Sequence, residues 1–380
     1  MDRQQKSRLK ILHLLYESKG DYFGIGGVGE RAYQIYTRLN KRHDITVLCK
    51  KYPGARNNMI EGIRHLFVGT ESSRLATTLL SYAFRAAQFV RKHGGEYDVI
   101  IEEFSPAIPT FLDHYRKKPV ILQIQGYTGR KYFEKYNPLF ALVLYCFERF
   151  RPRGYRQIIT VSPQTLEKYT LGATARVEVL SNGAPDDLFW CTPSEADYLL
   201  YLGRLDIHHK GLDILLTAFH SFSRGCPDIR LVIAGSGRDH DSLLQLIGKL
   251  PSDVQKKIEL RGWVAGDEKT CLLRDALMVV MPSRYETQGI VALEAMASGK
   301  ALVVSDIPEL DYVPACDGGV SFRQGDTDSL AAAISQLASR RDLHAMGQQG
   351  RKWVTNFTWD AIALRFDVIL QDTVAQHNRK

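Results

Sequence analysis

The stretch Met281–Asp306, with the sequence MPSRYETQGIVALEAMASGKALVVSD, decides the fold that the chain predicts. It begins at the end of an apolar strand, passes through a polar loop and continues into IVALEAMA, which has the apolar spacing of a helix. After Ser298-Gly299-Lys300 a second apolar segment follows, ALVVSD. The pattern therefore predicts a strand–loop–helix–strand unit of an α/β sheet.

Two carboxylates of this unit are candidates for ligand binding. Glu286 lies in the loop at the carboxyl end of the first strand, and Glu294 lies about a turn and a half inside the helix. Gly289 lets a ligand approach the helix start, where N–H groups and the helix dipole favour a phosphate. This suggests a nucleotide-linked ligand with a carboxylate on either side. Composition alone favours the alternative, an ordinary βαβ unit, because Glu is common in helices.

Strand-like and helix-like segments alternate on both sides of this unit, which is typical of mostly parallel, doubly wound sheets. The alternation stops at Ser181–Ala196, where an Asn-Gly pair, two prolines and acidic residues indicate a linker. The sequence therefore predicts an α/β fold with two Rossmann-like domains facing each other across a cleft, 1–183 and 184–358, followed by a last helix within 359–380. Ligands of such sheets bind beyond the carboxyl ends of the strands.

The individual elements follow from the same patterns. The expected strands include Lys10–Glu17, Asp44–Cys49, Ile63–Val68, Asp98–Glu102, Val120–Gln125 and Tyr198–Gly203. The expected helices include Glu30–Leu39, Ser72–Lys92, Leu139–Phe150 and Gly211–Phe222.

Length and composition limit the class of protein. A chain of 380 residues with 44% hydrophobic and 24% charged residues is expected to form two globular domains. No apolar run is long enough to span a membrane, and the polar, basic N-terminus does not resemble a signal peptide. The six cysteines are widely separated, which predicts no metal knuckle and favours a reduced, cytoplasmic setting.

The net charge of +8 is unevenly distributed along the chain. Residues 1–185 hold 29 Lys and Arg against 16 Asp and Glu, whereas residues 186–380 hold 21 against 26. A basic half fits an anionic partner, such as a membrane lipid or a phosphate-bearing substrate, and equally a surface whose charge serves solubility. No basic run of five residues and no aromatic-rich RNA motif occurs, which argues against nucleic acid.

The apolar segment Leu139–Phe147, LFALVLYCF, is too short to span a bilayer. Its apolar character all round favours a buried helix. The alternative is a peripheral contact with an anionic membrane, because basic residues flank the segment. These flanking residues are Lys131, Lys135, Arg149, Arg151 and Arg153.

Two cations follow the first strand of the second domain. Arg204 comes directly after Gly203, and Lys210 precedes Gly211, which opens the expected helix. A guanidinium and an ammonium group there can hold a diphosphate and neutralise the charge that develops on it as a leaving group. The alternative is a pair of solvated side chains. A cation at the N-terminal end of a helix is disfavoured by the dipole, which supports the functional interpretation.

Glycine-rich loops follow other strands. The loop Gly24–Gly29, GIGGVG, precedes a helix, and its N–H groups can approach an anion or form a flexible turn. Gly235 follows a later strand and either lines a nucleotide or forms a tight turn. The Trp263–Val264 backbone can meet a base edge, whereas the Trp263 side chain is expected in the core.

Asp326-Thr327-Asp328 has the DxD form that some sugar-transfer enzymes use to hold a metal. It directly precedes an amphipathic helix, so we interpret it as a helix cap with an acidic first turn. His208-His209 and Asp239-His240-Asp241 lack a further matched ligand. The sequence therefore predicts neither a metal nor a cofactor.

Together these residues resemble the large family of retaining group 1 glycosyltransferases, which has the GT-B fold. The matching motifs are E-x7-E at Glu286–Glu294, GRL-x4-KG at Gly203–Gly211, SNGAPDDLF at Ser181–Phe189 and the GGVG loop. The resemblance covers essentially the whole chain. It implies transfer of a sugar from a nucleotide-diphospho-sugar of UDP or GDP type, with retained anomeric configuration, to an acceptor hydroxyl in the synthesis of a glycan, glycolipid or glycosylated metabolite.

The resemblance also implies roles for single residues. Arg204 and Lys210 would hold the donor diphosphate, and Glu286 would contact the donor sugar, so these three are the expected catalytic residues. The residues implied at the donor are Gly26, Gly27, Arg204, Lys210, Gly235, Val264, Glu286, Gly289, Ile290 and Glu294, the last of them at the ribose. The family is usually metal-independent. Its first domain binds the acceptor and its second the donor, and its last helix crosses back to the first domain.

The sequence departs from the family pattern after the strand Val120–Gln125. Many members carry a His there, whereas this chain has Gln125-Gly126-Tyr127. Because Gln cannot exchange a proton near neutral pH, a mechanism with a His base is not supported. A front-face reaction, in which the leaving phosphate accepts the acceptor proton, needs no such His. Acceptor binding is expected from Gln125, Tyr127 and Glu103, with Glu102 as an alternative to Glu103.

The expected protein is thus a metal-independent, retaining glycosyltransferase that acts on hexosyl donors. Its expected partners are a nucleotide-diphospho-sugar and a hydroxyl acceptor on a sugar, a glycolipid or a small molecule. Its expected location is the cytoplasm, with peripheral contact at the inner face of the membrane as a further hypothesis. The alternatives are a GT-B-fold nucleotide-sugar epimerase and a non-catalytic nucleotide-sugar binding protein.

Overall fold

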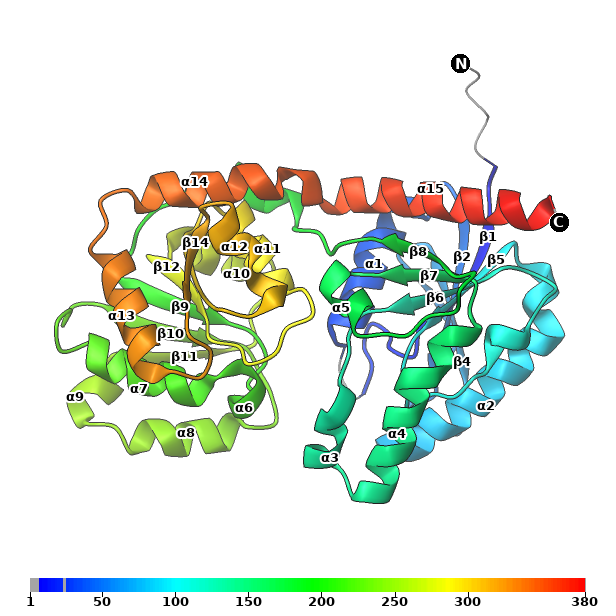
Figure 1. The fold of residues 1–380 in the computed structure, drawn as a ribbon, viewed down its shortest axis with the longest axis horizontal. Helices are drawn as coiled ribbons and strands as arrows, with labels where there is room; N and C mark the ends of the chain where they lie inside the picture. The colour runs from blue at the N-terminus through cyan, green and yellow to red at the C-terminus, as the bar shows by residue number, and fades with distance from the viewer. Residues whose placement is uncertain (1–6, 23–24, 380) are drawn as a thin grey trace, which may run out of the picture. The chain divides into compact units, whose positions relative to one another are not determined.

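The computed structural model describes residues 7–22 and 25–379. The chain folds as two units: unit 1 comprises Met1–Ser181 and Trp359–Lys380, and unit 2 comprises Asn182–Thr358. Each unit has a sheet of its own with helices packed against it (Figure 1). Both units are α/β, in agreement with the alternation of segments in the sequence.

The sheet of unit 1 has eight strands in the described part of the chain, in the spatial order β3-β4-β2-β1-β5-β6-β7-β8. Neighbouring strands are parallel except for the edge pair β3 and β4. The strands are β1 (Lys10–Leu14), β2 (Asp44–Lys50), β3 (Asn58–Ile60), β4 (Ile63–Val68), β5 (Val99–Glu103), β6 (Val120–Ile124), β7 (Gln157–Thr160) and β8 (Arg176–Val179). The central strands are almost entirely buried because helices cover both faces of the sheet.

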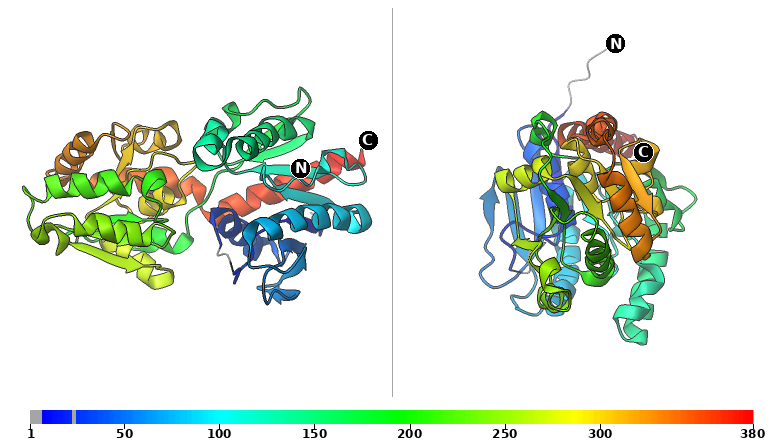
Figure 2. Two further views of the ribbon diagram at one scale, coloured as in Figure 1. Left: turned by 90° about the horizontal axis from the view of Figure 1, so that it is seen from below. Right: turned by 90° about the vertical axis from the view of Figure 1, so that its left-hand side faces the viewer.

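The α-helices of unit 1 are α1 (Gly27–Leu39), α2 (Leu75–His93), α3 (Tyr132–Lys135), α4 (Pro138–Phe150), α5 (Pro163–Glu167) and α15 (Trp359–Asn378). The last of them, α15, runs beside α1 (Figure 2). Its Phe366 ring lies 6.2 Å from that of Tyr36, and Arg38 donates to Asp360 at 2.5 Å. The helix that follows unit 2 in sequence is therefore part of the core of unit 1.

The sheet of unit 2 has six strands in the described residues, all parallel, in the order β11-β10-β9-β12-β13-β14. The strands are β9 (Tyr198–Leu202), β10 (Arg230–Ala234), β11 (Ile258–Gly262), β12 (Met278–Met281), β13 (Leu302–Ser305) and β14 (Gly319–Phe322). The helices are α6 (Ile207–Lys210), α7 (Leu212–Phe222), α8 (His240–Gly248), α9 (Ser252–Gln255), α10 (Gly266–Asp275), α11 (Ile290–Ala297), α12 (Tyr312–Ala315), α13 (Thr327–Ala338) and α14 (Leu343–Val354).

Each sheet has a point at which the direction of strand addition reverses. In unit 2, β9 lies between β10 and β12, and in unit 1, β1 lies between β2 and β5. At such a switch point the loops after the two central strands leave toward opposite faces and open a crevice at the carboxyl edge. The loops after β9 and β12, and those after β1 and β5, are therefore the places where each unit can hold a ligand.

The observed elements agree with the prediction where the local pattern is strong, and β4 has the predicted bounds. β1 ends at Leu14, three residues earlier than expected, and the short edge strand β3 is not predicted at all. A strand of three residues, exposed on one side, carries too little apolar pattern to be recognised.

Two predictions about burial are wrong. Trp263 is 70% exposed rather than in the core. In α4, Leu139 is 76% exposed, and the buried residues are Ala141, Leu144 and Glu148. The helix packs through this one narrow face, so most of its apolar surface faces solvent. No helix in the described part of the chain is long and apolar enough to cross a membrane.

Candidate functional site

The loops that follow β9 and β10 pack closely at the carboxyl edge of the unit 2 sheet. The Gly203 N–H donates to Ala234 at 3.0 Å, and the Gly235 N–H donates to Gly262 at 2.6 Å. Gly235 has φ +145°, and a Cβ on it would lie 1.8 Å from the Gly203 carbonyl oxygen. Only glycine allows this approach, and the role of Gly235 at a nucleotide stays a prediction.

Lys210 and Glu286 meet across the switch point. The Lys210 Nζ lies 2.5 Å from Glu286 Oε1, which also accepts from Ser283 Oγ at 2.8 Å. Glu286 follows β12 and Lys210 follows β9, so the two neighbouring strands bring together residues that are 76 positions apart. The Lys210 side chain is 26% exposed and that of Glu286 9%, so both reach the surface from a partly buried position.

Lys210 lies at the C-terminal end of a helix, whereas the sequence predicted it at the N-terminal end of one. It is the last residue of the short helix α6, and α7 begins only after Gly211. Asp206 caps α6 by accepting from the His209 N–H at 3.0 Å. The free carbonyl groups at the C-terminal end of a helix favour a cation, so the dipole favours Lys210 at this position. The prediction that the dipole disfavours Lys210 is therefore wrong.

Gly211 is what allows Lys210 to approach the loop after β12. It has φ +66°, and a Cβ on it would lie 2.0 Å from the Pro282 carbonyl oxygen. Gly262 has the same φ of +66°, but a Cβ there would meet nothing within 4 Å. The two glycines therefore differ in the space around them and not in backbone conformation.

We expect Gly211→Ala to destabilise the protein more than Gly262→Ala. Both substitutions impose the left-handed penalty, about 1–2 kcal/mol, and only Gly211→Ala adds a clash with backbone, about 1–3 kcal/mol. Urea unfolding of the two variants measures the difference. Equal losses of unfolding free energy would show that the contact with Pro282 does not constrain this segment.

Arg284 is a residue of this site that sequence reasoning missed. Its guanidinium forms a bidentate pair with Asp213 at 2.8 and 2.7 Å and donates to the His208 carbonyl at 2.9 Å. Its own N–H donates to the His209 carbonyl at 2.9 Å. Arg284 thus fastens the segment that carries Lys210 to the loop that carries Glu286. The sequence motif around Arg284 does not indicate this role, because the partners of Arg284 lie more than 70 residues away in sequence.

Arg204 lies at the same edge of the sheet and is exposed. Its backbone is fixed, since its carbonyl accepts from the Tyr201 hydroxyl at 2.7 Å. Among the residues that the structure describes, none forms a hydrogen bond or ion pair with its guanidinium. Arg204 therefore presents an unneutralised charge next to the switch point.

The helix α11 begins at Ile290 with Gly289 as its N-cap, and no side chain caps this end. The first N–H groups of a helix have no intrahelical acceptor, so this end favours an anion. One turn further, the buried Glu294 lies 2.6 Å from the Lys269 Nζ of α10. Lys269 is a second residue that the sequence did not reveal, and it links Glu294 to the surface.

Val264 follows β11 and is buried, while the neighbouring Trp263 side chain points to solvent. The structure therefore brings the expected donor residues of unit 2 to the carboxyl ends of β9, β10, β11 and β12. These residues are Arg204, Lys210, Gly235, Val264, Glu286, Gly289, Ile290 and Glu294.

In unit 1 the glycine loop already holds a carboxylate. Glu17 Oε2 accepts from the Gly26 N–H at 2.9 Å and from the Gly29 N–H at 2.8 Å, at the N-terminus of α1. Burial raises the pKa of Glu17, and the two backbone donors act in the opposite direction. The Gly26 N–H thus faces Glu17, while Gly27 is exposed. Binding of the donor by these two glycines stays a prediction. Gly24, also part of this loop, lies outside the described residues.

At the unit 1 switch point, Glu103 is buried beneath Gln125. Its Oε1 accepts from Gln125 at 3.0 Å and from Gln123 at 2.5 Å, and His13 Nε2 lies 3.4 Å away. The His13 ring also bonds to the Tyr36 hydroxyl at 2.7 Å. Gln125 is partly exposed, whereas Glu103 is not. Glu103 therefore holds Gln125 in place, and direct contact of Glu103 with an acceptor stays a prediction.

Glu102 points to the other face of β5 and does not take part in this group. It accepts from Arg151 at 2.5 Å, from the Tyr155 hydroxyl at 2.5 Å and from the Thr110 hydroxyl, and all four side chains are buried. Adjacent strand residues face opposite sides of a sheet, which is why only one of the two glutamates can lie near Gln125. This placement argues against the alternative that assigned Glu102 to the acceptor.

Tyr127 lies in the loop after β6, with its ring edge-on to that of Tyr169 at 5.2 Å. Glu148 of α4 holds this loop, since it accepts from the N–H groups of Thr128 at 2.8 Å and Gly129 at 2.6 Å. Burial raises the pKa of Glu148, while these donors lower it. Glu148 is a third residue that the sequence did not single out.

The DxD segment forms a helix cap, as predicted. Asp326 is the N-cap of α13 and accepts from the Ser329 N–H at 2.9 Å. The described residues contain no group of three or more His, Cys, Asp or Glu side chains arranged to hold a metal ion.

Comparisons with known proteins agree with this geometry. Residues 196–340 match the family model described as glycosyl transferases group 1, and residues 25–188 match that of glycosyltransferase family 4. A glycogen synthase of Mycobacterium tuberculosis is 27% identical over 383 aligned positions, which cover 89% of each chain. A phosphatidyl-myo-inositol mannosyltransferase of Mycolicibacterium smegmatis is 34% identical over 155 positions, 40% of this chain and 39% of that one.

Among solved structures, a sucrose-phosphate synthase from Thermosynechococcus elongatus has the same fold. It superposes with a TM-score of 0.79 at 20% identity, covering 97% of this chain and all of the other. The two family models meet at the boundary between the units, and the fold is GT-B. The chain belongs to the group 1 glycosyltransferases.

Proposed function

We propose that the protein is a retaining glycosyltransferase that takes its sugar from a nucleotide-diphospho-sugar of UDP or GDP type. The observation that carries this proposal is the convergence of Arg204, Lys210 and Glu286 at the switch point of unit 2, beside the uncapped start of α11. Two cations and a helix N-terminus match a diphosphate, and a carboxylate beside them matches sugar hydroxyls.

The same cations supply the charge stabilisation that transfer needs. The bond from the anomeric carbon to the diphosphate breaks, and negative charge grows on the leaving oxygen. Arg204 and Lys210 would neutralise that charge in place, which is the role that divalent metals serve in other transferases. We therefore propose metal-independent transfer. In a front-face reaction the leaving phosphate accepts the acceptor proton, so Gln125 needs only to orient the acceptor hydroxyl.

Glu286 and Glu294 would divide the donor between them. Glu286 is held by Lys210 and Ser283 on one oxygen, and a donor sugar would take up the exposed side of the carboxylate. Glu294 is buried and paired with Lys269, so a ribose would bind at the edge of that pair. Gly235 and the Val264 backbone would line the nucleotide.

Unit 1 would bind the acceptor through Gln125 and Tyr127. Glu103 fixes the Gln125 amide from below, and Glu148 fixes the loop of Tyr127. The similarity to a phosphatidyl-myo-inositol mannosyltransferase and the basic charge of residues 1–185 support an acceptor that is linked to a lipid. A sugar or small-molecule hydroxyl is the alternative.

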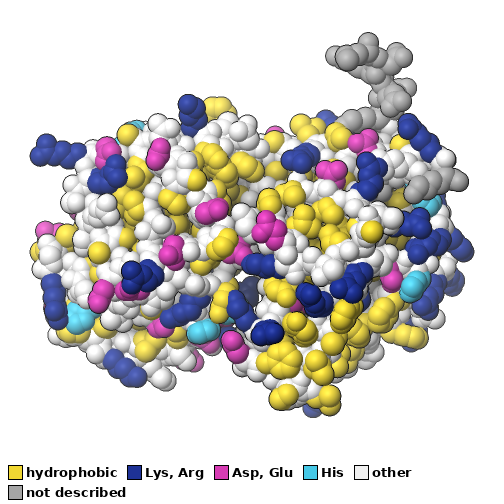
Figure 3. Space-filling view, in the orientation of Figure 1, with side chains coloured by type: hydrophobic (Ala, Val, Ile, Leu, Met, Phe, Trp, Pro, Cys, Tyr) yellow, Lys and Arg dark blue, Asp and Glu magenta, His cyan; other side chains and the backbone are white. Residues whose placement is uncertain are grey.

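The surface of α3 and α4 supports a peripheral location at an anionic membrane. We call it the α4 surface and define it by its exposed apolar side chains, which are Phe133, Tyr136, Leu139, Phe140, Leu142 and Val143. Figure 3 shows apolar side chains gathered here with Lys and Arg beside them. Of the expected basic neighbours, Arg149 and Arg153 reach the surface, Arg151 is buried with Glu102, and the side chain of Lys135 lies outside the described part.

We expect Leu139→Glu/Leu142→Glu to weaken binding to vesicles of phosphatidylglycerol by at least about tenfold. The two side chains lose the transfer energy of their apolar surface, and the new charges are repelled by the anionic lipid. Co-sedimentation measures the effect. Leu244→Glu on α8 is the matched control, because Leu244 is also about half exposed but lies in unit 2. Equal binding of both variants would contradict this location.

The stereochemistry of transfer tests the proposed function. After a screen for the nucleotide sugar that raises Tm most, proton NMR of the first product should show the donor's anomeric configuration, and EDTA should leave the rate unchanged. An inverted product would overturn retention, and loss of activity that Mg²⁺ restores would overturn metal independence. Conversion of the donor sugar without transfer would indicate an epimerase instead.

A further inference from the structure

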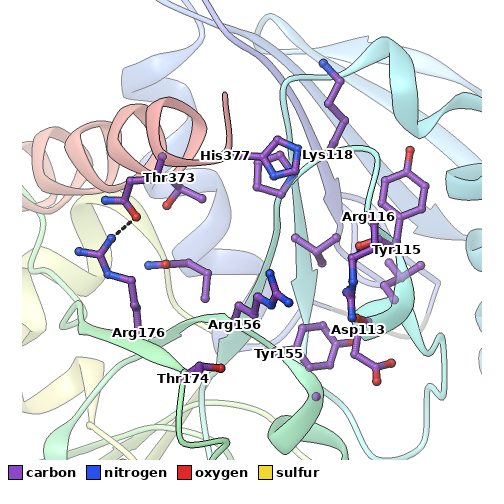
Figure 4. A pocket seen from close by; sticks show the side chains of 16 residues that line it. Asp113, Tyr115, Arg116, Lys118, Tyr155, Arg156, Thr174, Arg176, Thr373 and His377 are labelled. Atoms are coloured by element: carbon purple, nitrogen blue, oxygen red, sulfur yellow. Dashed lines mark hydrogen bonds between the residues drawn. The ribbon is translucent and has the colours of Figure 1, made fainter. Parts of the chain in front are cut away.

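Unit 1 contains a cavity at the edge of its sheet opposite to the acceptor residues. Its volume is about 620 Å³, within the range of small-molecule sites. It lies where β6, β7 and β8 begin, and the end of α15 closes one side of it (Figure 4). Gln125 follows the other end of β6, and at about 3.3 Å per residue the strand separates it from the cavity by about 16 Å.

Cations from three separate segments line this cavity. Arg116 and Lys118 precede β6, Arg156 precedes β7, and Arg176 is the first residue of β8. His377 of α15 joins them from the other side. The one carboxylate among the lining residues is Asp113. The lining therefore carries four positive charges against one negative charge.

Three of these four positive charges have no carboxylate partner in the described part of the chain. They belong to Arg116, Arg156 and Arg176. Lys118 is 4.0 Å from Asp98, which is the outer limit of an ion pair. Arg176 instead donates to the neutral Gln376 amide, as the dashed line in Figure 4 shows.

Arg156 and Arg176 lie on neighbouring segments of the sheet, and both line the cavity. The Arg176 N–H donates to the Arg156 carbonyl at 2.8 Å, so the two side chains leave adjacent points of the sheet. Figure 4 shows Arg156 directed toward the middle of the cavity, between Arg176, Tyr155 and His377. Like charges that line one cavity repel each other, and an anion bound between them removes this repulsion.

We propose that this cavity binds a ligand with two or more phosphate groups, separately from sugar transfer. The guanidinium groups of Arg156 and Arg176 would each take a phosphate in bidentate fashion, with Arg116 and Lys118 at the rim. A ligand there would also touch Thr373 and His377, so it would fasten the end of α15 to the sheet. The phosphates belong either to a soluble compound or to a lipid headgroup.

Calorimetry with inorganic tripolyphosphate as the probe tests the proposal. We expect saturable binding at one site, weakened at least about tenfold by Arg156→Gln and by Arg176→Gln. Lys117→Gln is the matched control. Lys117 is exposed and lies between the lining residues Arg116 and Lys118 in sequence, but it does not line the cavity. The affinity of this variant should stay within about twofold of that of the unmodified protein.

The source of the phosphates is distinguished by a second arm with phosphatidylcholine vesicles that contain a phosphatidylinositol bisphosphate, whose headgroup carries several phosphates. Loss of tripolyphosphate binding with unchanged co-sedimentation supports a soluble ligand, and loss of both supports a headgroup. Absence of saturable tripolyphosphate binding at low salt would overturn the proposal, as would equal losses in Lys117→Gln and the two arginine variants. All three residues are exposed, so circular dichroism and Tm serve to confirm that each variant is folded.

Discussion

Replacing Lys210 by alanine is expected to lower kcat/KM for sugar transfer at least tenfold, which is about 1.4 kcal/mol of transition-state stabilisation. The substitution lowers the transfer rate in two ways. The leaving diphosphate loses one of its two cations, and Glu286 loses the partner that lies 2.5 Å away and holds its carboxylate in place. Steady-state kinetics with the donor found in the nucleotide-sugar screen measures the loss.

Lys249→Ala is the control for this prediction, because Lys249 is exposed at the end of α8 in the same unit and lies outside the site. Its kcat/KM should be unchanged. Lys210→Ala/Glu286→Ala should be less impaired than the sum of the two single changes, because the side chains act as a coupled pair. If Lys210→Ala keeps its activity within about twofold, the assignment of the diphosphate to this position is wrong.

Glu102→Gln is expected to lower the free energy of unfolding by about 3 kcal/mol or more. The change keeps the shape of the side chain but removes the charge that Arg151 faces at 2.5 Å in the interior of unit 1. Arg151 is then left as a buried, uncompensated cation, although it still donates to the carbonyl groups of Ser105 and Ile108. Urea unfolding measures the loss.

The transfer rate of the folded Glu102→Gln protein should not change, because Glu102 faces away from Gln125. Glu167→Gln on α5 is the matched control, since Glu167 is exposed in the same unit, and its unfolding free energy should stay within about 0.5 kcal/mol of that of the unmodified protein. A Glu102→Gln protein with unchanged stability and a lower transfer rate would contradict this prediction and support Glu102 as an acceptor residue.

The grouping of the expected donor residues at one edge of the sheet could be predicted because its signals are local. Glu286, Gly289 and Glu294 lie within nine positions of one another, and the strand before them fixes the edge at which they emerge. Arg204 and Lys210 sit at the end of another strand of the same parallel sheet, so both groups must reach the same edge. The sequence did not predict the order of the strands in the sheet. This order makes β9 and β12 neighbours.

Other features depend on contacts that no local pattern records. Whether α4 is buried is decided by how many elements pack around it, and its apolar composition suits a buried helix and a membrane surface equally. The pairing of Glu17 with the glycine loop needs the chain to turn back from β1 onto the start of α1. The sequence shows that Glu102 and Glu103 point to opposite sides of their strand. Only the pairing of β5 with β6 decides that Glu103 is the one near Gln125.

The proposed function requires Arg204 and Lys210 to hold a nucleoside diphosphate. The most direct measurement is calorimetric titration with UDP and UMP, and with GDP and GMP, on the unmodified protein and on Arg204→Ala and Lys210→Ala. The unmodified protein should bind one diphosphate at least about tenfold more tightly than its monophosphate, and this ratio should fall toward one in both variants. An unchanged ratio in both variants would contradict the account, because the second phosphate would then be bound elsewhere.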